Sequence, residues 1–69
     1  MNNKELKIMS SMIVEKGLEF RKGTVSGYSI EIEEIDPQSF TSFTYYEDKQ
    51  KRDSDFDLLS QLMFNHVTS

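Results

Sequence analysis

Few residues of this chain combine the types and spacing that chemistry requires. His66 is the only histidine among the 69 residues, and there is no cysteine. A nucleophilic site needs a Ser or Cys held beside a base that a third group orients. A lone histidine without a paired nucleophile does not meet that requirement, so we interpret His66 as a cation that complements the negative end of a helix. We therefore predict no catalytic residue and no enzymatic activity.

The alternating acidic pattern Asp53-Ser54-Asp55-Phe56-Asp57 resembles the first positions of a calcium-binding loop. Such a loop requires a glycine at its sixth position and a bidentate glutamate at its twelfth, where this chain has Leu58 and Phe64. The aspartates suit the first turn of a helix equally well, because the helix dipole favours anions there. We therefore predict neither a metal site nor a cofactor.

Glu31 and Glu33 lie two residues apart, the spacing that places two carboxylates on one face of a strand. A carboxylate pair can act as acid and base, but raising the pKa of a carboxyl group requires burial in a cleft. A flat sheet face offers no such cleft. Gly23 and Gly27 lack the spacing of a phosphate-binding loop and are interpreted as turn glycines.

Acidic residues are the main feature left to carry a function. Twelve acidic residues against eight basic ones give a net charge of -4, which on average repels nucleic-acid phosphates. A dense acidic array can complement a basic groove on another protein, with an aromatic side chain as its anchor. We therefore predict a partner-binding surface that consists of Glu31, Glu33, Glu34, Asp36, Tyr46, Glu47 and Asp48.

The composition indicates one small domain that spans residues 1–69. A chain of this length has a thin core and must be held together by packing alone, since cysteine is absent. No apolar run approaches the roughly 18 residues that a membrane-spanning helix requires. The N-terminus lacks the basic and apolar regions of a secretory signal. We therefore expect a cytoplasmic protein.

Two periodicities predict the elements that position these residues. In segment 3–16 five apolar residues fall on one arc of about 160° of a helical wheel, namely Leu6, Ile8, Met9, Met12 and Ile13. Asn2 or Asn3 can cap this helix, and Gly17 suits its end. From residue 18 onward apolar and polar residues alternate instead, which predicts strands within 18–24, 28–33 and 40–46.

Turn chemistry and cross-strand pairing predict the register of an antiparallel meander. A three-residue turn with Gly27 in the left-handed conformation places Phe20 opposite Ile32, apolar against apolar. A two-residue turn at Ser26-Gly27 would set Arg21 against Ile32 instead, so we favour the three-residue turn. Between the second and third strands, aligning Ile32 with Phe43 pairs apolar residues along one face, with Ile30 opposite Tyr45. This register turns Tyr46 and the glutamates toward solvent.

The last part of the chain predicts a charged loop followed by a helix. Residues 47–53 are mostly charged, and Ser54 followed by Asp57 resembles a capping box, so we place the helix at about residues 55–66. Each helix has one apolar face, so both are expected to cover the same face of the sheet. The predicted fold class is α+β, an α-β-β-β-α chain with a three-stranded antiparallel meander in the order 1-2-3.

We expect a non-enzymatic interaction module, a regulator or inhibitor that docks its acidic surface on a basic groove of a partner protein. In size and charge the chain is similar to phage inhibitors of host nucleic-acid enzymes, although no motif ties it to that class. One alternative is a nucleic-acid-binding accessory protein that uses Lys49, Lys51 and Arg52. Another is a small subunit that completes an oligomeric enzyme. A homodimer through an edge strand is a further expectation.

Overall fold

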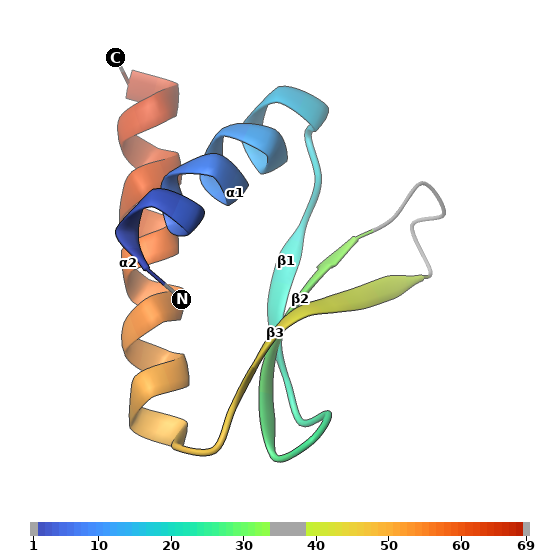
Figure 1. Ribbon diagram of the computed structural model, residues 1–69. Coiled ribbons are helices and arrows are strands. Elements are labelled where there is room, and N and C mark those ends of the chain that lie inside the picture. The colour runs from blue at the N-terminus through green and yellow to red at the C-terminus, as the bar shows by residue number, and fades with distance from the viewer. Residues whose placement is uncertain (1, 34–38, 69) are drawn as a thin grey trace.

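The computed structural model describes residues 2–33 and 39–68 (Figure 1). Within these ranges the elements are α1 (Asn3–Lys16), β1 (Phe20–Gly23), β2 (Tyr28–Glu33), β3 (Phe40–Tyr46) and α2 (Lys49–Thr68). The strands form an antiparallel sheet in the order β1-β2-β3; α2 packs against β2 and β3, and α1 packs mainly against α2. The predicted α-β-β-β-α fold with a meander is therefore confirmed.

Helix α1 has the predicted bounds because both of its ends are set by local chemistry. Asn2 is the N-cap, and its side-chain Oδ1 accepts a hydrogen bond of 2.8 Å from the backbone N–H of Glu5. Gly17 ends the helix at φ 64°, a left-handed conformation that glycine adopts without a steric penalty. The buried face of α1 consists of Leu6, Ser10 and Ile13.

The β1–β2 hairpin also has the predicted register. Phe20 pairs with Ile32, and residues 25–27 form the turn between the strands. Gly27 has φ 101°, and Ser26 has φ 55°. A serine with positive φ is uncommon, so the turn holds one residue whose conformation the sequence did not indicate.

The predicted register between β2 and β3 is wrong. Ile30 pairs with Thr44 while Glu31 pairs with Ser42, so Phe43 is the extra residue of a β-bulge. The pairs at the Tyr46 end of β3 differ from the prediction by one residue, and a one-residue change reverses which side chains face the core. Tyr46 is consequently buried at 8% exposure, whereas Tyr45, which we expected to face the helices, is 55% exposed.

Helix α2 begins at Lys49, so the predicted loop over 47–53 and the capping box at Ser54 are wrong. Asp48 supplies the cap instead, because its Oδ1 accepts a hydrogen bond of 3.0 Å from the backbone N–H of Gln50. The charged run lies on the first turns of the helix, where Lys51 pairs with Asp55 four residues later.

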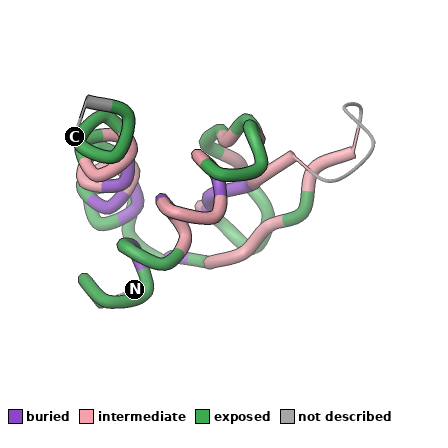
Figure 2. Tube along the Cα trace, turned by 90° about the horizontal axis from the view of Figure 1, so that it is seen from above, coloured by how far each residue is buried: buried purple, intermediate pink, exposed green. Residues whose placement is uncertain are grey.

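The hydrophobic core is small and joins both helices to the sheet. Its buried members come from α1, α2, β2 and β3, as Leu6, Ile13, Ile30, Tyr46 and Leu59. Figure 2 shows buried positions on both helices and on the sheet. Phe20, Ile32 and Phe43 pack against this core from the sheet, as expected.

Candidate functional site

The structure divides the predicted acidic surface between the two ends of the sheet. Glu33 pairs with Phe40 at one end, whereas Tyr46, which precedes Glu47 and Asp48, pairs with Tyr28 at the other. The six residues of β2 separate these ends by about 17 Å. Glu33 is half-buried, and Glu47 and Asp48 are exposed. Residues 34 and 36, the predicted sites Glu34 and Asp36, lie outside the described residues.

Glu31 does not face solvent as predicted, because its cross-strand neighbours enclose it. Its exposure is 8%, and its Oε1 accepts a hydrogen bond of 2.8 Å from Arg21 Nε. Ser42, opposite Glu31 because of the bulge, donates to the other carboxylate oxygen at 3.5 Å. Gly23 leaves room for this carboxylate, since a Cβ there would collide with it. Glu31 is therefore a neutralised carboxylate within the sheet face, and the expected exposure is wrong.

Tyr46 is likewise part of the folded interior, and the expectation of an exposed aromatic anchor is wrong. Its hydroxyl donates a hydrogen bond of 2.6 Å to Asp55 Oδ2, and Asp55 also accepts one of 3.1 Å from Lys51 Nζ. Burial and the hydrogen bond to Asp55 raise the pKa of Tyr46 to about 12. Burial of Asp55 opposes ionisation, but hydrogen bonds from Tyr46 and Lys51 outweigh it and lower the pKa of that carboxyl group.

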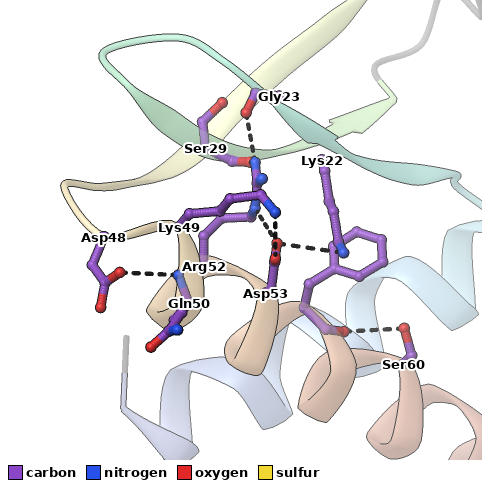
Figure 3. A network of polar contacts seen from close by, with 10 residues as sticks. Lys22, Gly23, Ser29, Asp48, Lys49, Gln50, Arg52, Asp53 and Ser60 are labelled. Atoms are coloured by element: carbon purple, nitrogen blue, oxygen red, sulfur yellow. Dashed lines mark hydrogen bonds and ion pairs between the residues drawn. The ribbon is translucent and has the colours of Figure 1, made fainter.

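Arg52 joins the start of α2 to the β1–β2 hairpin (Figure 3). Only 6% of Arg52 is exposed. Its Nη1 donates to the carbonyl oxygen of Gly23 at 2.7 Å and to that of Ser29 at 3.4 Å. The guanidinium carbon also lies 5.2 Å from the centre of the Tyr28 ring. Arg52 therefore satisfies backbone carbonyls of both strands and fixes how α2 sits on the sheet.

Asp53 is the common partner of three cationic side chains, one of which is Arg52. Arg52 Nε donates to Asp53 Oδ1 at 2.7 Å, and Lys22 Nζ lies 3.4 Å from the same oxygen. Lys49 Nζ lies 3.7 Å from Asp53 Oδ2. The hydrogen bond from Arg52 is the main reason that the pKa of Asp53 is lowered. Figure 3 shows these side chains converging from β1 and the first turns of α2.

Sequence reasoning missed this network because it placed residues 49–53 in a loop. One available signal was the spacing of Lys49 to Asp53 and of Lys51 to Asp55, since opposite charges four residues apart are typical of a helix. The contacts of Arg52 with the strand carbonyls leave no such signal, because they join residues more than twenty positions apart.

An open groove lies between α1 and the C-terminal half of α2. Figure 1 shows α1 and α2 diverging toward their C-terminal ends. The groove has a volume of about 830 Å³, and we name it the helix groove, lined by Lys7, Ile8, Ser11, Met12, Glu15, Leu62, Asn65 and His66. Ile8 is 59% exposed there, so an apolar side chain remains in contact with solvent. The sequence placed Ile8 on the apolar arc of α1 and gave no indication that α2 leaves it uncovered.

The described residues contain few other features that could carry out chemistry. In residues 2–33 and 39–68 there is no group of three or more His, Cys, Asp or Glu residues placed to hold a metal ion. None of the described helices has the length and apolar character needed to cross a membrane. Comparisons with protein-family models, with curated proteins and with solved structures each gave no match.

Proposed function

We propose that this protein is a non-enzymatic interaction module that docks an acidic surface on a basic region of a partner protein. The supporting observation is how the charges are distributed at the start of α2. Lys49 and Lys51 pair with aspartates on their own helix, and Arg52 is buried. Glu47 and Asp48, by contrast, are exposed on the turn between β3 and α2. Each of these basic residues therefore already contacts a carboxylate of its own helix, and the adjacent acidic residues face solvent.

Two exposed carboxylates define this region. We name Glu47 and Asp48 the acidic end. Asp48 also accepts the capping hydrogen bond from Gln50, which fixes its side chain in place. Carboxylates held on a folded element can meet a basic surface with a smaller loss of side-chain entropy.

The same charge distribution weighs against nucleic-acid binding through Lys49, Lys51 and Arg52. A phosphate that bound these residues would have to compete with Asp53 and Asp55, which already contact them. Phosphate contacts supply most of the affinity of a non-specific nucleic-acid binder. Binding a protein through the exposed acidic residues would therefore break fewer ion pairs within the chain than binding a nucleic acid through these basic residues.

The test compares two charge reversals that change the net charge equally. Glu47→Lys alters the acidic end, whereas Glu19→Lys alters an exposed residue whose backbone carbonyl accepts from Glu33 at the opposite end of the sheet. Tagged wild-type and variant proteins are incubated with a lysate of the native host, and bound proteins are quantified by mass spectrometry. We expect a basic protein to be recovered by the wild type and by Glu19→Lys, and several times less by Glu47→Lys.

Salt and nucleic acid provide the second part of the test. Recovery of the basic partner should fall as the salt concentration rises, because exposed charges are screened. Identical recovery by all three proteins would contradict the proposal. Saturable binding of a DNA or RNA oligonucleotide at physiological salt would favour the nucleic-acid-binding alternative instead.

A further inference from the structure

We propose that the helix groove is the interface of a symmetric homodimer, in which α1 of a second copy of this chain packs antiparallel against α1. This interface is separate from the acidic end and does not depend on the proposed function. The structural basis is the order of side chains along the groove side of α1, namely Lys7, Ile8, Ser11, Met12 and Glu15.

The charges on this side of α1 complement themselves under a two-fold rotation. Lys7 and Glu15 lie four residues to either side of Ser11, which is about 6 Å along the helix axis in each direction. A two-fold axis that passes through Ser11 reverses the second helix, so that Lys7 of each copy lies level with Glu15 of the other. Such an isologous contact forms each ion pair twice. A helix from an unrelated protein would have to match this order of charges independently.

The centre of the same face is suited to close contact between helices. Ser11, at the proposed axis, has a small side chain that allows two helix backbones to approach each other. Ile8 and Met12 on α1 and Leu62 on α2 provide the apolar surface beside it. Ile8 is 59% exposed in the single chain, and its burial in a dimer would remove apolar surface from water.

The size of this side of the molecule limits how tight the dimer can be. A specific interface at the low end of the usual range buries about 600 Å² on each partner. The surface of the chain is 4694 Å², so a dimer of that size would use roughly one eighth of it. Helix α1 of 14 residues extends about 21 Å, and a helix with its side chains is about 10 Å wide. Two helices side by side cover about 420 Å² in projection, so we expect a weak, reversible dimer.

The oligomeric state of the full chain is the first measurement. Sedimentation equilibrium from low micromolar to about 1 mM protein should show a reversible change from the 8.1 kDa monomer to a species of twice that mass. Ile8→Glu should weaken dimerisation about tenfold or more, since it places a charge in the apolar part of the interface. Val25→Glu is the matched control, because Val25 is 47% exposed on the β1–β2 turn, outside the helix groove. It should leave the dissociation constant unchanged.

A charge exchange tests the antiparallel arrangement itself. Lys7→Glu and Glu15→Lys each replace two attractive contacts with two repulsive ones, and each should weaken the dimer about tenfold. The double variant Lys7→Glu/Glu15→Lys restores opposite charges across the axis and should recover most of the wild-type affinity. Circular dichroism of each variant checks that the fold is retained.

Three results would overturn the proposal. A wild-type chain that stays monomeric over the whole concentration range would refute the homodimer, and a helix of another protein would then be the alternative occupant of the groove. A dimer that is unaffected by Ile8→Glu would require a different interface, such as the edge of β3. A double variant that binds no better than the single ones would refute the two-fold arrangement about Ser11.

Discussion

Replacing Tyr46 with phenylalanine removes one hydroxyl group and keeps the ring in the core. That hydroxyl donates a 2.6 Å hydrogen bond to Asp55, whose exposure is only 3%. Its loss removes one of the hydrogen bonds to the buried carboxylate, whereas the one from Lys51 remains. Hydrogen bonds to charged groups contribute about 1.5–3 kcal/mol, so we expect Tyr46→Phe to lower the free energy of unfolding by about 2 kcal/mol. A domain of 69 residues has roughly 3–10 kcal/mol in total.

The raised pKa of Tyr46 gives this prediction a pH dependence. The folded pKa of about 12 exceeds the ordinary tyrosine value of about 10. The associated stability is therefore fully present below pH 10 and is lost as the pH rises toward 12. A shift of two pKa units corresponds to about 2.7 kcal/mol. The difference in stability between the wild type and Tyr46→Phe should consequently shrink to near zero across that window.

Urea denaturation followed by far-UV circular dichroism measures both effects, at one protein concentration and at several pH values between 7 and 11.5. Tyr45→Phe is the matched control, because Tyr45 is 55% exposed and should change the free energy of unfolding by less than about 0.5 kcal/mol. A loss below about 0.5 kcal/mol for Tyr46→Phe would refute the assigned role of the hydroxyl. A loss that stays constant from pH 8 to 11.5 would refute the pKa argument.

Three further substitutions probe the polar contacts, each measured by urea denaturation. Arg52→Met should cost about 2–3 kcal/mol because it removes a buried guanidinium that donates to carbonyls of both strands, whereas Lys49→Met, on an exposed side chain, should cost less than about 0.5 kcal/mol. Equal costs would contradict the role of Arg52. Gly23→Ala should destabilise the fold by about 1–2 kcal/mol by displacing the Glu31 carboxylate, and less in a Glu31→Ala background if the collision is the cause. Because its folded pKa is lowered, Asp55 contributes stability above pH 4 that is lost as the pH falls. Asp55→Asn should therefore make the free energy of unfolding fall less steeply as the solution is acidified below pH 4. An unchanged pH dependence would contradict this.

Local chemistry explains why much of the fold could be predicted from the sequence. The bounds of α1 depend on Asn2 and Gly17, which act within four residues of the helix ends. The β1–β2 register depends on a turn that tolerates positive φ at Gly27. In each case the deciding interaction joins residues that are close in sequence, so residue type and spacing carry the information.

The candidate site could be predicted only in part, because its exposure depends on contacts between distant residues. Reasoning from apolar pairs alone favoured an outward Tyr46, but the bulge at Phe43 and the partner Asp55 on α2 turn it inward. Glu31 was correctly placed on the outer face of the sheet, yet Arg21 and Ser42 enclose and neutralise it there. The acidic composition was thus evident, whereas which carboxylates face solvent was not.

The sequence by itself determined the number, order and type of the elements, the ends of α1 and the turn between β1 and β2. Only the tertiary structure decided the β2–β3 register, the burial of Tyr46 and the helix groove left between α1 and α2. The physical reason is the range of the interactions. Caps, turns and alternation are satisfied within a few residues, whereas Arg52 finds its acceptors and Tyr46 its carboxylate only when the helix has packed on the sheet.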